Sequence, residues 1–145
     1  GQVIEDAYEY FDAVAPMVYP SHYARGFIGY DNPAEHPYEV VKYSMDGAVG
    51  RLVATKKMTV SATIATATVE KIVSVPKFKA KLRPWLQDFD LGAVYGTDKV
   101  GDQIRAVYDS FLAPGGGLES SYGGWMLWDP ANKYAESALN YKKEL

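Results

Sequence analysis

The chain has 145 residues, of which 48% are hydrophobic, and this composition suits one globular domain with an apolar core. Its formal net charge of −3 gives no basic footprint for nucleic-acid binding, and no apolar run reaches the roughly 18 residues of a membrane span. Cysteine is absent, which excludes disulfides and thiolate metal sites, and with two histidines we expect neither a metal nor a cofactor.

The first predicted elements are a short helix and a strand. Ile4, Tyr8 and Phe11 recur at helical spacing, so the chain is expected to enter on a helix before a strand at residues 12–18. That strand is apolar with little alternation, which is typical of parallel strands covered on both faces. We therefore expect it to be buried on both sides.

The loop that follows this strand is long and rich in aromatic residues. It runs from Pro20 to about His36, where glycines, Asp31-Asn32 and Pro33 disfavour regular structure. Disordered segments are poor in aromatic residues, whereas the segment from Tyr19 to Tyr38 carries four tyrosines, one phenylalanine and both histidines of the chain. The pattern therefore predicts an ordered loop that forms part of a binding surface.

Two further strand and helix units are predicted after this loop. We expect helices that begin at Pro37 and Thr97, where Pro suits the first helical residue and Thr suits an N-cap. Strands are predicted at residues 81–89 and 123–129, and a last helix follows the second of these. The apolar stripes of the three helices comprise Val41, Met45, Ala48 and Leu52, then Val100, Ile104, Val107 and Phe111, and finally Tyr134, Ala138, Tyr141 and Leu145.

This alternation predicts an α/β fold with parallel strands joined by crossover helices, in which sites gather at the strand ends. Tyr19, Asp88 and Asp129 should then lie at one end of the sheet. Three strands are too few for a closed barrel, which needs about eight, so we expect part of a barrel or a small open sheet in a single domain, 1–145. Residues 54–80 interrupt the pattern as an insertion, whose β-branched content favours strand although its alanines would tolerate helix.

Four motifs occur in order along the chain, namely "PMVYPSHY", "HPYEVV", "RPWLQDF" and "GGWMLWDPANKY". With these motifs the chain resembles a bacterial family of TIM-barrel proteins of largely unknown function, described as putative glycosyl hydrolase domains. The resemblance covers most of the chain except residues 54–80, and it implies the last three β/α units of that barrel. The earlier strands, including the family's acidic strand-end motif near mid-barrel, have no counterpart here. The resemblance also implies a polysaccharide substrate or ligand, and a location in the cell envelope or outside the cell.

The residues at the strand ends independently fit a sugar site. Such sites pair flat aromatic rings, which stack on C–H faces, with carboxylates and amides that bind hydroxyl groups. Glycoside hydrolysis also needs two carboxyl groups, about 5–5.5 Å apart for retention or about 6.5–9.5 Å for inversion. Asp88 and Asp129 end neighbouring strands, which lie about 4.8 Å apart, and they are the candidate catalytic pair. The candidate substrate-binding residues are Tyr19, Ser21, His22, Tyr23, Trp85, Gln87, Trp128 and Asn132.

Each of these candidates also has a structural interpretation. Asp129 fits an Asx turn or an N-cap, Asp88 fits an ion pair with Arg83 or Lys81, and both tryptophans fit a core. No acidic residue lies near His22 in the sequence, so a catalytic triad is unsupported. Three functions therefore stay open: the C-terminal part of a glycoside hydrolase, a non-catalytic carbohydrate-binding or scaffolding module, and a structural fragment without a ligand.

The edges of a partial barrel predict association. Its first and last strands expose unpaired N–H and C=O groups, which pair readily with another chain. We therefore expect a homodimer, or a missing N-terminal half of the barrel, as the protein partner. Alternatively, residues 59–69 could fold back and cover one edge from within the chain.

Overall fold

The computed structural model of the chain describes residues 3–61, 68–111 and 118–140. In this part of the chain the fold is mixed α/β, with short parallel strand pairs, three α-helices and a separate β-hairpin. The helices are α1 (Ile4–Tyr10), α2 (Pro37–Leu52) and α3 (Thr97–Phe111), and the strands are β1 (Ala13–Val14), β2 (Val53–Ser61), β3 (Thr68–Pro76), β4 (Lys81–Leu82), β5 (Trp85–Gln87) and β6 (Met126–Trp128). Short 3-10 helices are η1 (Pro20–His22), η2 (Phe27–Gly29), η3 (Pro33–Glu35), η4 (Glu119–Ser121) and η5 (Glu136–Asn140).

The short strands form three neighbouring chain segments that run in the same direction: the first contains β1, the middle one contains β4 and β5, and the third contains β6. β1 pairs with β4 and β5 pairs with β6, both in parallel. A parallel bridge between Met17 and Trp85 shows that the first segment also runs beside β5. The carboxyl ends of the three segments therefore lie at one end of the sheet, which confirms the prediction for Tyr19, Asp88 and Asp129. The described strands do not close into a barrel.

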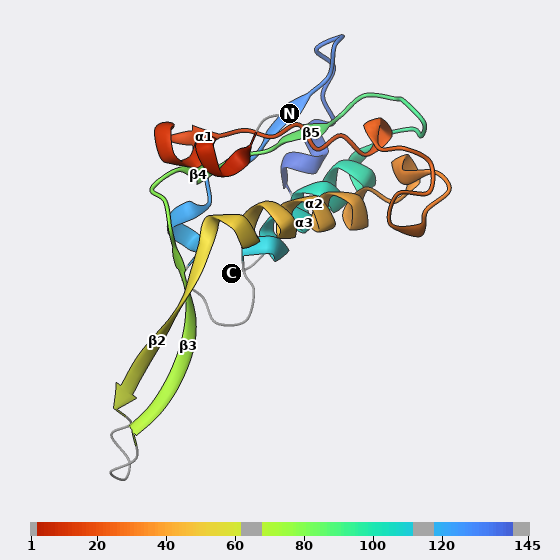
Figure 1. The fold of residues 1–145 in the computed structure, drawn as a ribbon. Helices are drawn as coiled ribbons and strands as arrows, with labels where there is room; N and C mark the ends of the chain where they lie inside the picture. Colours follow the sequence, from red (N-terminus) through yellow and green to blue (C-terminus); the bar gives the residue numbers. More distant parts are fainter. Residues whose placement is uncertain (1–2, 62–67, 112–117, 141–145) are drawn as a thin grey trace.

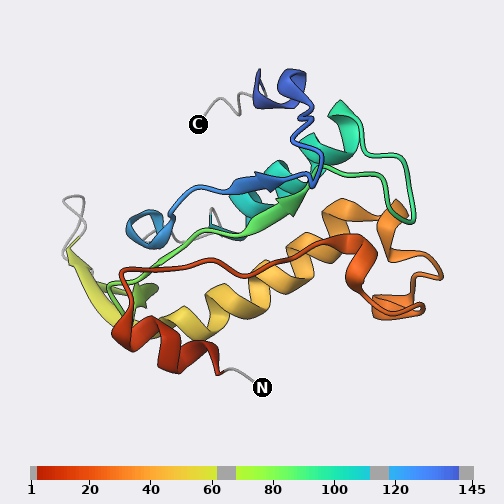
Figure 2. The same ribbon diagram turned by 90° about the horizontal axis from the view of Figure 1, so that it is seen from above.

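The helices cover only one face of this sheet. α2 and α3 pack against each other on that face (Figures 1 and 2). Along the middle segment, Leu82 and Leu86 are fully buried in the core, whereas Lys81 and Arg83 between them are exposed. Met17 of the first segment is 71% exposed. The prediction that the first strand is buried on both faces is wrong, because no described helix covers the second face.

The helical predictions are confirmed for α2 and α3 and fail after the third strand. α2 begins at Pro37 and α3 at Thr97, and the apolar stripes of both helices face the core. Beyond β6, the described residues form only η5, because Ala138 is buried whereas Tyr134 is 41% exposed. Within the described residues, a single buried alanine adds little apolar burial that could stabilise an α-helix. Tyr141 and Leu145 lie outside the described residues.

Most of the insertion at 54–80 is a β-hairpin. β2 and β3 pair in antiparallel register from Val53 with Pro76 to Ser61 with Thr68, which confirms the strand prediction. The hairpin extends away from the rest of the described chain (Figure 1). It forms a sheet of its own, so among the described residues it covers no edge of the parallel sheet. Residues 62–67 of the predicted strand region lie outside the described part.

Candidate functional site

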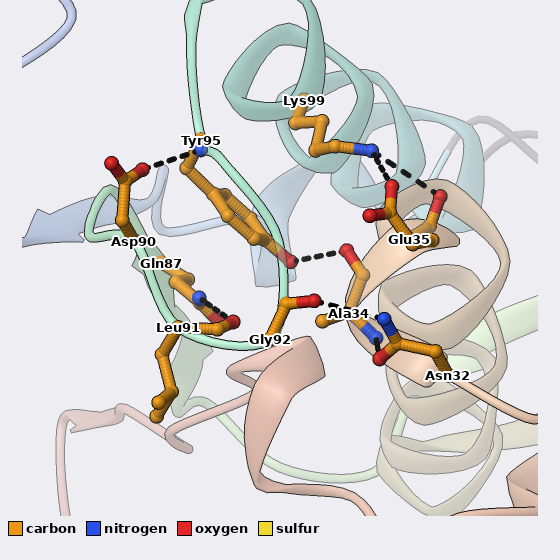
Figure 3. Close-up of polar contacts among 9 residues, drawn as sticks. All are labelled: Asn32, Ala34, Glu35, Gln87, Asp90, Leu91, Gly92, Tyr95 and Lys99. Atoms are coloured by element: carbon orange, nitrogen blue, oxygen red, sulfur yellow. Dashed lines mark hydrogen bonds and ion pairs between the residues drawn. The ribbon is translucent and has the colours of Figure 1, made fainter.

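Gln87, at the end of β5, connects two loops and helix α3. Its backbone N–H donates to Gln103 Oε1 at 2.9 Å, and its carbonyl accepts from Gln103 Nε2 at 2.7 Å. Its side-chain Oε1 accepts from the Ser21 N–H at 3.1 Å, and its Nε2 donates to the Phe89 carbonyl at 2.9 Å. The same Nε2 also donates to the Leu91 carbonyl at 3.4 Å (Figure 3). Every polar group of this fully buried residue is therefore used within the protein, and Gln87 acts on the site by holding the loops.

The loop after the first segment and the loop after β5 are joined by further polar contacts (Figure 3). Asn32 Nδ2 donates to the carbonyl of Gly92 at 2.8 Å, and Asn32 Oδ1 accepts from the Ala34 N–H at 3.2 Å. The buried Tyr95 hydroxyl donates to the carbonyl of Ala34 at 3.0 Å. The predicted loop is thus ordered, and its order comes from backbone contacts as well as from its aromatic rings.

The predicted aromatic site residues of this first loop lie in two different places. Tyr19 and His22 contact Phe89, with ring centroids 5.5 and 6.0 Å from the Phe89 ring, at the carboxyl end of the sheet. Burial raises the pKa of the Tyr19 hydroxyl. Tyr23 instead packs on Phe27 and its hydroxyl lies 2.7 Å from Ser44 Oγ on α2. The structure therefore brings Tyr19 and His22 to the strand ends and places Tyr23 against the helix.

Trp85 and Trp128 form an accessible aromatic pair on the face that the helices leave uncovered. Their ring centroids are 6.1 Å apart and the rings are nearly perpendicular, at 85°. Trp128 is 44% exposed and Trp85 is half-buried, so the core interpretation does not hold for Trp128. Trp128 therefore offers an accessible ring face beside the strand ends, and Trp85 packs against it edge to face.

The carboxylates of Asp88 and Asp129 both accept hydrogen bonds from the turn that follows β6. Asp129 Oδ1 accepts from the N–H groups of Ala131 and Lys133 at 2.6 and 3.2 Å, which confirms the Asx-turn interpretation. Asp88 Oδ2 accepts from the Ala135 N–H at 2.8 Å. The two acids occupy neighbouring positions, since the Asp88 N–H donates to the carbonyl of Trp128, the residue before Asp129, at 2.9 Å.

The alternative of an ion pair between Asp88 and Arg83 or Lys81 is wrong. Lys81 and Arg83 are exposed whereas Asp88 is buried, and no ion pair joins Asp88 to either of these described residues. Burial raises the pKa of the Asp88 carboxyl above its ordinary value. The hydrogen bond from Ala135 opposes this shift, and the charges of Asp129 and Asp90 add to it.

Asn132 lies in the same turn and is exposed. Its backbone is left-handed, with φ of 55°, a conformation that asparagine tolerates better than most residues. Its N–H donates to the carbonyl of Asp129 at 3.1 Å. Its amide is thus carried to the surface at the end of the third segment.

A family model described as "Putative glycosyl hydrolase domain" matches residues 1–134 of the chain. The chain belongs to this family. The match runs through the hairpin residues, which the four sequence motifs do not include. No curated protein and no solved structure matches the chain.

Membership in the glycosyl hydrolase domain family implies a carbohydrate ligand and names no specific substrate. Within the described residues, no group of three His, Cys, Asp or Glu side chains could hold a metal ion. Over the same residues, no helix of this glycosyl hydrolase domain is both long and apolar enough to cross a membrane.

Sequence reasoning missed three residues that shape the site of this domain, namely Asn32, Tyr95 and Gln103. Gln103 had the clearest signal, because a polar residue lies on the buried stripe of α3, directly before Ile104. A buried amide must find partners, and its partners here are the backbone groups of Gln87. Asn32 precedes a proline and fits a cap, but its contact with Gly92 spans 60 positions and has no sequence signal.

Proposed function

We propose that this domain binds a polysaccharide at the carboxyl ends of its three parallel segments, with Trp85 and Trp128 as the surface on which sugar rings stack. The observation that carries the proposal is the tryptophan pair, of which Trp128 is exposed, beside the strand ends of a glycosyl hydrolase family member. Tyr19 and His22 lie where the first segment ends and Asn132 lies where the third ends, and Gln87 holds the loop that contains Ser21.

We further propose that the chain forms the C-terminal units of a glycoside hydrolase barrel. Parallel β/α units with two open sheet edges support this interpretation. In this role Asp88 is the general acid, because its raised pKa favours the protonated form, and Asp129 is the second carboxyl group. Carbohydrate chemistry of this kind supports a location in the cell envelope or outside the cell.

One observation favours a non-catalytic alternative. Both carboxylates already accept backbone hydrogen bonds from residues 131–135, and this suits acids that fix a turn. The domain would then bind carbohydrate and leave hydrolysis to another chain. Binding and hydrolysis must therefore be tested separately.

Binding is tested by titrating the chain with a panel of soluble glycans while following tryptophan fluorescence. Trp128→Ala is expected to weaken the affinity for a bound glycan about tenfold, because a stacking surface is removed. Trp125→Phe is the matched control, since Trp125 packs against the core and should retain affinity. No response to any glycan would reject the carbohydrate function.

Hydrolysis is tested by measuring reducing-end release from the glycans that bind. Asn at position 129 keeps the oxygen that accepts the two turn N–H groups, so Asp129→Asn should fold and lose hydrolysis, and Asp88→Asn should also lose it. Binding with no hydrolysis by the unmodified chain would support the non-catalytic alternative.

A further inference from the structure

A row of cations leads along the chain to the tryptophan pair. Every second residue from Lys77 to Arg83 is basic, and the next position in the series is Trp85. The four basic side chains are exposed, whereas the residues between them are buried or half-buried in the core. The cation row therefore consists of Lys77, Lys79, Lys81 and Arg83.

No ion pair joins a member of the cation row to any carboxylate of the described residues. The ion pairs of this part of the chain involve other cations, namely Arg25, Lys42, Arg51, Lys99 and Arg105. The acids that share a hollow with the row are Glu9 and Asp12 beside Lys79, and Glu136 beside Arg83. None of these three acids forms an ion pair with it, so the positive charge of the row is available to a ligand.

The strand geometry aligns the last members of the row with the aromatic surface. Lys81, Arg83 and Trp85 occupy every second position of the middle segment and so share one of its faces. Neighbouring members lie about 6.6 Å apart along the strand. The third segment leaves room for them at Gly123, where a Cβ atom would lie 3.0 Å from Lys81 Cβ and 3.2 Å from Arg83 Cβ. A larger residue at position 123 would push both cations out of place.

The net charge of −3 of the whole chain does not reveal that its basic residues are concentrated around the cation row. Residues 51–83 contain eight of the 15 basic residues of the sequence but only one of its 18 acidic residues, Glu70. The remainder of the chain is therefore strongly acidic. Such an asymmetry within one chain indicates an anionic partner at the basic segment.

We propose that the cation row binds the acidic groups of a polysaccharide whose sugar rings stack on Trp85 and Trp128. This rests on the proposed function and specifies its substrate class as a polymer that carries carboxylate or sulfate groups. A neutral polysaccharide would leave four exposed cations without a counterpart. Nucleic acid fits less well, because one charge per about 1.7 Å of duplex would meet the acidic remainder of the chain.

The test compares Lys81→Gln/Arg83→Gln with Arg25→Gln/Lys42→Gln. Each double variant removes one Lys and one Arg, so their net charges are equal, and Gln keeps the side-chain stem that packs beside Gly123. The probes are oligogalacturonate, its neutral methyl ester, a sulfated oligosaccharide and a single-stranded oligonucleotide. Binding to the 145-residue chain is followed by tryptophan fluorescence at two salt concentrations.

We expect oligogalacturonate or the sulfated probe to bind at least tenfold more tightly than the methyl ester, with the preference reduced by salt. The row variant should lose about tenfold in affinity for the acidic probe and nothing for the ester, whereas the control variant keeps both affinities. Lys81→Arg should bind the acidic probe as tightly as the unmodified chain, since the charge is kept, whereas Lys81→Gln should bind it more weakly.

Equal affinity for the acidic probe and its ester would overturn the inference and leave the carbohydrate function standing. An equal loss in both double variants would also overturn it, because net charge rather than the row would then explain binding. Tighter binding of the oligonucleotide than of every acidic sugar would assign the row to nucleic acid. No binding of any sugar would reject the proposed function itself.

Discussion

At the scale of single residues, Gln103 replaces a missing strand. The first segment turns into its loop at Tyr19, so it no longer pairs with the backbone of Gln87. Gln103 reaches from α3 and satisfies both the N–H and the carbonyl of that residue. An unpaired buried backbone group costs about 1–3 kcal/mol, so this one amide stabilises the end of β5 on which the site depends.

Asp88 predicts a pH dependence of stability. Burial raises its pKa in the folded state above the ordinary value of 3.8, so the folded protein holds this proton more tightly than the unfolded chain does. The contribution to the free energy of unfolding is complete below pH 3.8 and is lost as the pH rises through the folded-state pKa. Asp88→Asn removes this titration, so its melting temperature relative to the unmodified chain should rise with pH. Thermal unfolding between pH 3 and pH 8 measures it, and a difference that is independent of pH would contradict the expectation.

Gly92 predicts how tightly the two loops fit. Its φ is 72°, and a Cβ atom there would lie 2.9 Å from Ala34 Cβ in the facing loop. Gly26 has a similar φ of 85° but no atom within 4 Å of such a Cβ, so Gly26→Ala isolates the backbone cost, about 1–2 kcal/mol. Gly92→Ala should cost at least about 1 kcal/mol more in urea denaturation, because it also overpacks the loop contact. Equal losses would show that the loops can separate freely.

At the scale of elements, the sequence predicted those parts that depend on local periodicity. The stripes from Val41 to Leu52 and from Val100 to Phe111 specify α2 and α3, because the buried residues of a helix recur every three or four positions in the sequence. The prediction that the first strand is buried on both faces was wrong. Met17 is apolar, but whether its side chain is buried depends on whether another element covers that face of the sheet, and local sequence does not show this. The contact between Asn32 and Gly92 joins two loops and follows from the assembled fold.

The hairpin is predicted to be separable from the parallel sheet. Its two ends are already adjacent, because Val53 pairs with Pro76 and the Lys77 N–H donates to the carbonyl of Leu52 at 2.9 Å. Replacing residues 54–75 by Asn-Gly should close the chain with a two-residue turn and change the free energy of unfolding by less than about 1 kcal/mol. Circular dichroism and urea denaturation check this. Loss of cooperative unfolding would mean that the hairpin supports the sheet.

At the scale of the whole molecule, the first segment presents an edge with which no strand of the described residues pairs. Its hydrogen bonds to the middle segment use Asp12, Val14, Pro16 and Val18, so Ala13, Ala15 and Met17 turn their backbone groups outward. The missing N–H of Pro16 therefore lies on the paired side and does not block the edge. A groove of about 610 Å³ between α1 and this edge is lined mainly by apolar residues, including the exposed Tyr10 and Phe11.

This edge predicts self-association, because an unpaired strand with exposed apolar neighbours is a template for another strand. We expect a dimer that dissociates on dilution, observed by light scattering on the purified chain. Met17→Lys places a charge on the edge and should shift the chain to the monomer, since burying an unpaired charge opposes pairing. Val94→Lys is the matched control, because Val94 is 74% exposed in the loop after β5 and its substitution should leave association unchanged. A 16.0 kDa monomer at every concentration would show that this edge does not recruit a second copy of the chain, and would favour a different protein, such as a missing barrel half, as its partner.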